Sequence, residues 1–191
     1  MGRTRLGCGL VLLVLAGVAV LGLAVTASHP YRTLAPVPRS DAAAQSANRK
    51  LLEIAASGVA ARATGRPTPF RVAFSDEELT SMLAARMPGD VFSDVVVRAR
   101  TGSVIEGTTT AHLGPLATPI YFQATVVAED GHPTFEVLET KAGQLGVPGI
   151  FDGLVASALQ GVPLANRLVT VRDVSLVTAP GESTIAGTAI P

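Results

Sequence analysis

An uncharged, strongly apolar run near the N-terminus constrains this chain more than any other feature. The run extends from Cys8 to Val25, and Arg3 and Arg5 precede it. At a rise of about 1.5 Å per residue, a helix over this run is about 27 Å long, close to the apolar thickness of a bilayer. Because arginines on the short side of such a helix favour the cytoplasm, we expect residues 1–28 to span the membrane and the rest of the chain to lie outside the cytoplasm.

A cleaved signal peptide is the alternative interpretation of the same residues. Val25-Thr26-Ala27 places small residues where a signal peptidase cleaves. The apolar run is longer than the core of about 7–15 residues that is usual in signal peptides, which favours a retained anchor. With an anchor the protein is a single-pass cell-membrane protein, and with a cleaved leader it is secreted, so the domain is extracytoplasmic in both cases.

The rest of the chain divides into a spacer and one domain. Residues 29–39 contain Pro30, Pro36 and Pro38, which disfavour a helix and suit an extended spacer next to the membrane. Residues 40–191 are about 150 residues long, enough for one domain that buries its own core.

Periodicity and turn residues predict the elements of this domain. A helix is expected from Ser40 or Asp41 to Ala61, and Ser75-Asp76-Glu77-Glu78 is a capping box that begins a second helix, which Pro88-Gly89 ends. Asp130-Gly131 predicts a tight turn between two strands. The expected strands are Phe70–Phe74, Asp94–Arg100, Val104–Leu113, Thr118–Ala128, Thr134–Lys141, Leu168–Thr178 and Ser183–Ile190, with a third helix over Ile150–Leu159.

This order of elements predicts an α+β fold. We expect a strongly curved, mostly antiparallel sheet packed on two or three helices. The strand Thr118–Ala128 is apolar on both faces over Ile120 to Phe122, so we expect it to be central or covered.

Composition argues against several partners. Lysine plus arginine and aspartate plus glutamate number 15 each, and removal of Arg3 and Arg5 with the leader leaves 13 basic residues against 15 acidic ones. Without a basic field, and with 4% aromatic residues and no tryptophan, a nucleic-acid partner is not expected. Cys8 is the only cysteine, so no internal disulfide is possible.

Motifs for catalysis or metal binding are missing from the sequence. His29, His112 and His132 lie outside metal-ligand spacing of one another, and no nucleophile elbow, phosphate loop or dinucleotide fingerprint is present. We therefore expect neither an enzyme nor a bound metal or cofactor. A lipid hydrolase would need a serine, a histidine and a carboxylate to converge, with His112 or His132 as its histidine.

The remaining candidate site is apolar. If the helices and the sheet fail to close completely, they leave a groove for an acyl chain; otherwise the same side chains form an ordinary core. The candidate lipid-binding residues are Leu79, Met82, Leu83, Ile120, Phe122, Val126, Phe135, Val137, Phe151 and Leu154.

Several segments resemble YpmS-like and LmeA-like bacterial membrane-anchored proteins. Phe74 to Leu83 is similar to their "S-E-E-E-L-N-x-L-L" helix start. Their "v-P-v … dG-x-l-x-f-x-v" strands are matched by Val95–Arg100, Thr118–Phe122, Glu129–Gly131 and Phe135–Val137, and Gly146–Gly149 and Val169–Val177 fit the order of their elements. The resemblance covers most of residues 70–190. It implies a fold similar to tubular lipid-binding domains and a role in envelope lipid or glycolipid handling.

Two classes of function follow from these patterns. The first is a membrane-anchored lipid-binding module that shields an acyl chain of a phospholipid or glycolipid by apolar burial, without catalysis. The second is a structural or interaction domain with a fully packed core, whose sheet edge or Ser40–Ala61 helix docks a membrane or cell-wall partner. The protein partner is not specified by the sequence.

Overall fold

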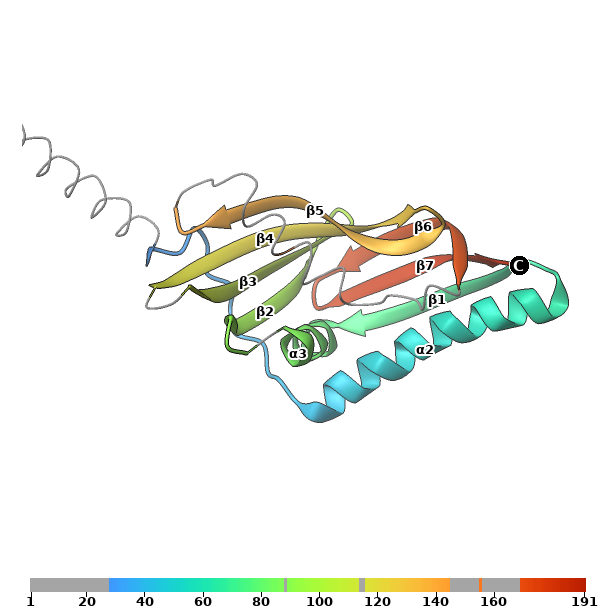
Figure 1. Cartoon of the computed structure of the whole chain (residues 1–191), viewed down its shortest axis with the longest axis horizontal. Helices are drawn as coiled ribbons and strands as arrows, with labels where there is room; N and C mark the ends of the chain where they lie inside the picture. The colour runs from blue at the N-terminus through green and yellow to red at the C-terminus, as the bar shows by residue number, and fades with distance from the viewer. Residues whose placement is uncertain (1–27, 88, 114–115, 145–154, 156–168) are drawn as a thin grey trace, which may run out of the picture.

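The computed structural model describes residues 28–87, 89–113, 116–144, 155 and 169–191 (Figure 1). Its elements are, in chain order, α2 (Asp41–Thr64), β1 (Thr68–Ser75), α3 (Asp76–Arg86), β2 (Phe92–Arg100), β3 (Val104–Leu113), β4 (Leu116–Glu129), β5 (His132–Ala142), β6 (Thr170–Ala179) and β7 (Glu182–Ile190). The α+β class is confirmed, and each of these elements overlaps one that the sequence predicted. The helix expected over Ile150–Leu159 lies outside the described residues except for Val155, which is helical and buried.

Helix α2 begins and ends where its sequence provides caps. The Ser40 hydroxyl accepts the Ala43 N–H at 3.1 Å, and Gly65 adopts a left-handed φ of 62° while its N–H donates to the Ala61 carbonyl. Between the caps, the helix buries a stripe of small and aliphatic residues against β1 and α3, including Leu51 and Ile54. In Figure 1, α2 runs along β1 at the lower edge of the molecule.

Helix α3 begins with the predicted capping box. The Ser75 hydroxyl accepts the Glu78 N–H at 3.1 Å, and Glu78 Oε2 accepts the Ser75 N–H at 2.8 Å. Two further side chains of the helix bind strand β2: Asp76 Oδ1 accepts the Ala99 N–H, and the Thr80 hydroxyl bonds both backbone groups of Val97. The residues from Ser75 to Thr80 therefore fix α3 to the sheet as well as capping it.

The strands form two antiparallel sheets instead of the single sheet that we expected. Strands β2 to β5 pair in sequence order, whereas β1, β7 and β6 form a separate three-stranded sheet in the order β1-β7-β6. The expectation of one sheet was wrong because the final hairpin pairs with β1, from Thr68 opposite Ala189 to Ser75 opposite Glu182, and does not extend the meander. Alternation of apolar residues predicts a strand but not its partner.

Both sheets share one core. Strand β6 lies against β4 and β5, and the Val171 N–H donates to the Gly131 carbonyl at 2.6 Å, which joins the two sheets. The Thr178 hydroxyl makes a second link by donating to the Arg100 carbonyl. Val155 is fully buried in the same hydrophobic cluster.

No helix among the described residues is both long enough and apolar enough to cross a membrane. The apolar run that we expect to do so lies within residues 1–27, outside the described part of the chain.

Candidate functional site

The predicted lipid-binding residues are interior residues of the core. Seven of them are at most 5% exposed, and Val137 is partly buried against them. The seven are Leu79, Met82, Leu83, Ile120, Phe122, Val126 and Phe135. Phe151 and Leu154 lie outside the described residues. The structure thus brings the described candidates together in one packed cluster.

Phe122 and Gly107 show how tightly this cluster is filled. They pair across β3 and β4, and a Cβ atom built on Gly107 would lie only 2.2 Å from the Phe122 ring. The ring therefore occupies the space above the glycine, and Phe122 is 0% exposed. At this position the protein's own side chain fills the volume that an acyl chain would need.

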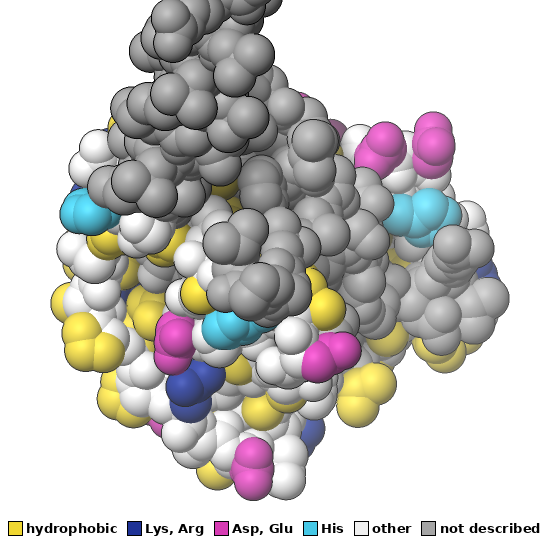
Figure 2. All heavy atoms as spheres, turned by 60° about the vertical axis from the view of Figure 1, so that its left-hand side comes forward, with side chains coloured by type: hydrophobic (Ala, Val, Ile, Leu, Met, Phe, Trp, Pro, Cys, Tyr) yellow, Lys and Arg dark blue, Asp and Glu magenta, His cyan; other side chains and the backbone are white. Residues whose placement is uncertain are grey.

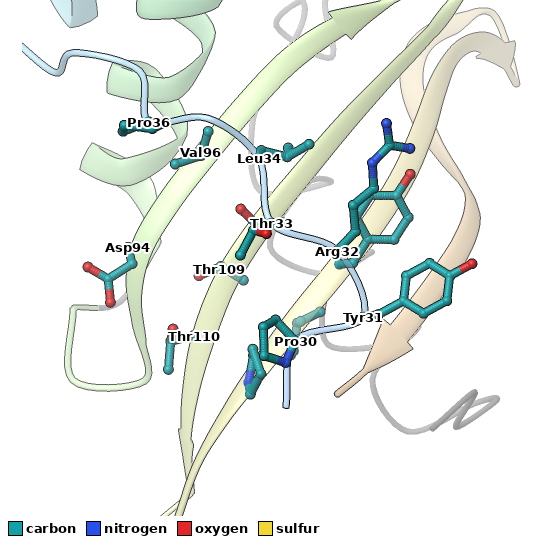
Figure 3. Close-up of a pocket in the computed structure, with 14 residues that line it drawn as sticks. Pro30, Tyr31, Arg32, Thr33, Leu34, Pro36, Asp94, Val96, Thr109 and Thr110 are labelled. Atoms are coloured by element: carbon teal, nitrogen blue, oxygen red, sulfur yellow. The ribbon is translucent and has the colours of Figure 1, made fainter. Parts of the chain in front are cut away.

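The opposite face of the β2–β5 sheet carries a feature that the sequence did not reveal. Residues 30–39, here called the strap, contain no helix or strand and cross β4, β3 and β2 in turn (Figure 3). We call this face the outer face; it is defined by one residue from each strand, of which Arg98 pairs with Glu106 and Tyr121 pairs with Lys141. The segment that the sequence predicted as an extended spacer thus contacts the domain along its length.

A chain of polar contacts holds the start of the strap. Arg32 Nη1 lies 3.1 Å from Glu106 Oε2, the Tyr121 hydroxyl donates to the same oxygen at 3.1 Å, and Gln123 Nε2 donates to the Tyr121 oxygen at 2.6 Å. Glu106 is only 7% exposed, so Arg32 supplies the cation that a buried carboxylate needs. Burial, together with the Glu106 carboxylate, raises the pKa of Tyr121 although Gln123 opposes the shift.

Aromatic contacts reinforce this attachment. The Tyr31 ring lies 5.5 Å from the Tyr121 ring at a tilt of 47°, and Lys141 Nζ lies 5.6 Å from the centre of the Tyr31 ring. Lys141 also pairs with Glu139 at 3.1 Å. Tyr31 itself remains 50% exposed.

The end of the strap is held by backbone contacts. Arg98 Nε donates to the Ala35 carbonyl at 3.0 Å, and its Nη2 donates to the Pro36 carbonyl at 3.4 Å. At the junction with α2, the Ser40 N–H donates to the Ser81 hydroxyl and the Ser40 hydroxyl donates to Glu77. The strap is therefore fixed at both ends and in the middle.

A hollow of about 320 Å³ lies between the strap and the outer face (Figure 3). Small side chains form its floor, among them Val96, Thr108 and Thr110, while Pro30 and Leu34 of the strap contribute to its wall. Methyl groups and hydroxyls dominate this lining.

Ser93, Asp94 and His112 converge near the hollow, as a hydrolase would require. Ser93 Oγ lies 2.9 Å from Asp94 Oδ2 and 2.9 Å from His112 Nε2. A serine has one hydroxyl hydrogen, and the carboxylate can only accept it, so His112 must donate to Ser93. A catalytic triad needs the reverse: histidine accepts the serine proton and the carboxylate binds the other ring nitrogen. Among the hydrogen bonds of the described residues, the Asp94 carboxylate binds Ser93 and not His112, so the arrangement differs from that of a triad.

Charges on the surface are mixed. Figure 2 shows acidic, basic and hydrophobic side chains interspersed on the coloured part of one face, without a continuous basic patch among those atoms. Within the part of the chain that the structure describes, no group of three or more histidine, cysteine, aspartate or glutamate residues could hold a metal ion.

The fold and the site define a class: an α+β domain of two antiparallel sheets whose N-terminal strap is bound to the outer face of one of them. No protein-family model matches the chain, and searches of curated proteins and of solved structures give no match either.

Proposed function

We propose that this chain is a non-catalytic interaction domain that its N-terminal apolar run holds on the extracytoplasmic side of a membrane. The observation that carries the proposal is the strap, because its contacts fix Arg32 and Ala35, which lie within ten residues of the end of the run, to the outer face. A linker that served only to separate the domain from the membrane would not need to bind the sheet. A domain that presents a surface to a partner gains affinity from a fixed orientation, since less freedom is lost on binding.

The packed interior supports a function carried out by the surface. The described candidates for lipid binding are buried together, and Phe122 fills the space above Gly107. An acyl chain could enter only by displacing such side chains, and opening a packed core costs several kcal/mol, about 2–5 for each large side chain removed.

Helix α2 offers the surface for the partner. Leu52 and Val59 are 67% and 68% exposed, and a spacing of seven residues places them on one face of the helix. Ala56 and Ala60 are also exposed on this face, so the apolar side chains form a stripe, and contiguous exposed apolar surface marks interaction sites. We therefore propose that a protein partner of the cell wall with apolar side chains binds along the second half of α2.

Photo-crosslinking on the full chain tests whether the interior of the domain is packed and closed to lipid. The protein is reconstituted in phosphatidylcholine–phosphatidylglycerol vesicles that contain a phospholipid with a photoactivatable acyl chain, and the adducts are mapped by peptide mass spectrometry. We expect adducts in the N-terminal apolar run and none in the peptides that contain Leu83 or Phe122. Adducts on those interior peptides would overturn the packed-domain proposal.

Lipid binding is the second candidate function. The buried apolar cluster that contains Leu79, Ile120 and Phe122 is the interior that an acyl chain would have to enter. This candidate is in keeping with the resemblance to YpmS-like and LmeA-like proteins. The same crosslinking experiment decides between the two functions.

A further inference from the structure

We infer that the corner of the outer face formed by Tyr31, Arg32 and Lys141 rests on the lipid headgroups of the membrane that anchors the chain. This inference rests on the proposed membrane attachment and goes beyond it, because it assigns a surface of the domain to the bilayer.

The length of the connecting chain sets the first limit. The apolar run ends at Val25, and the strap begins at Pro30, so five peptide units join them. An extended chain spans at most about 3.6 Å per residue, which places Pro30 within about 18 Å of the edge of the hydrocarbon layer. Headgroups occupy about 5–7 Å of that distance on each side of the bilayer.

Because the strap is bound to the sheet, the short distance between Pro30 and the bilayer also limits the position of the folded domain. Tyr31 contacts the Tyr121 ring, and Arg32 binds Glu106, so the residues next to the tether are fixed on β3 and β4. A flexible spacer would let the domain turn in any direction. In Figure 1 the start of the strap and the C-terminal end of α2 lie at opposite ends of the described domain. Attachment at the first residues of the strap therefore brings this corner of the sheet towards the bilayer and the C-terminal end of α2 away from it.

The chemistry of the corner fits the headgroup layer. Tyr31 is half exposed, and tyrosine is enriched where the apolar and aqueous layers meet. The Arg32 and Lys141 side chains are 46% and 27% exposed. Arg32 keeps Nη1 on Glu106, and its other N–H donors, with the Lys141 ammonium, are available to lipid phosphates. Their partners Glu106 and Glu139 keep the corner close to neutral, which suits a mixed zwitterionic and anionic surface.

Fluorescence quenching tests the inference in the full chain, with Cys8→Ser as background. A single cysteine at Glu139→Cys carries the probe on the outer face, because residue 139 lies two positions from Lys141 on β5. Val59→Cys on α2 and Val177→Cys on β6 are the controls, since both side chains are more than half exposed. Each control also carries Glu139→Gln, so that all three proteins lack the carboxylate that pairs with Lys141. The labelled proteins are reconstituted in phosphatidylcholine–phosphatidylglycerol vesicles that contain a lipid with a nitroxide on its headgroup.

We expect the probe at residue 139 to be quenched at least two-fold more than the probes at residues 59 and 177. Tyr31→Ala combined with Arg32→Ala should loosen the strap and reduce this difference. If the protein floats with the vesicles but all three probes are quenched equally, the inference fails and the membrane attachment stands. If the protein does not float with the vesicles, the proposed membrane attachment fails, and the inference fails with it.

Discussion

Arg32 Nη1 lies 3.1 Å from Oε2 of Glu106 and so joins the strap to a buried carboxylate in the middle of a sheet. Removal of the cation leaves Glu106 with the Tyr121 hydroxyl as its described hydrogen-bond donor. We expect Arg32→Ala to lower the free energy of unfolding by about 1–2 kcal/mol, between the values typical of exposed and buried ion pairs. Urea unfolding of Arg32→Ala, Glu106→Gln and the double variant measures the coupling. Additive effects in this cycle would show that the pair contributes nothing.

Attachment of the strap can be followed by proteolysis. Arg98→Met removes the hydrogen bonds to the Ala35 and Pro36 carbonyls and keeps most of the side-chain volume. Because these contacts are exposed, we expect a change of no more than about 0.5 kcal/mol in stability. Cleavage by trypsin after Arg32 or Arg39 should become several-fold faster. Arg49→Met on α2 is the matched control, and equal cleavage rates in both variants would count against a bound strap.

The contact between Gly107 and Phe122 predicts an overpacking penalty. Gly107→Ala places a methyl group 2.2 Å from the ring, so the ring or the strand must move. We expect a loss of about 1–3 kcal/mol, and about 3–5 kcal/mol for Phe122→Ala, which leaves a cavity. The double variant Gly107→Ala/Phe122→Leu should lose less stability than the sum of the losses measured for Gly107→Ala and Phe122→Leu separately, because the smaller side chain makes room for the methyl group. Full additivity in thermal unfolding would refute the contact.

The Glu78 carboxylate predicts a dependence of stability on pH. Burial raises the pKa of Glu78. Hydrogen bonds from Lys50, Ser46 and the Ser75 N–H, together with the Lys50 charge, lower this pKa by more than burial raises it, so the net shift is downward. A lowered pKa in the folded state means that the stabilisation is present above the unfolded value of 4.5 and is lost as the pH falls through the folded value. Unfolding of the wild type should become easier below about pH 4.5, and Glu78→Gln should show a smaller change over the same range.

Tyr121 predicts an effect at the other end of the pH scale. Its pKa is raised from 10.0, mainly by burial, so the folded state retains a proton that the unfolded state releases. Stability should therefore fall as the pH rises above about 10. The chain contains two tyrosines, so the difference between the phenolate absorbance titrations of the wild type and Tyr121→Phe assigns the transition to Tyr121. A transition assigned to Tyr121 at or below pH 10.0 would contradict a structure in which its hydroxyl is buried and hydrogen-bonded.

The candidate site was predicted only in part. The sequence selected Leu83 on a helix and Ile120 and Phe122 on a strand as apolar residues that face one another, and the structure does bring them together. Whether such residues line a groove or fill a core depends on the distance between helix and sheet, which periodicity does not encode. The strap was missed because Tyr31 and Arg32 lie among prolines, and their partners Tyr121 and Glu106 are far away in the sequence. One signal was present: the strand around Ile120 to Phe122 is apolar on both faces, and the strap covers Tyr121 on the outer one.

Local chemistry by itself determined where α3 begins and where the chain turns between β4 and β5. The Ser75–Glu78 capping box and the Asp130-Gly131 turn, with its positive φ angles of 49° and 76°, each depend on residues within one turn of each other. Only the tertiary structure decided that β7 pairs with β1, that Phe122 covers Gly107 and that the strap binds the outer face. These choices depend on complementary shape and charge between distant segments, and many pairings satisfy the same alternation of apolar residues until the chain folds.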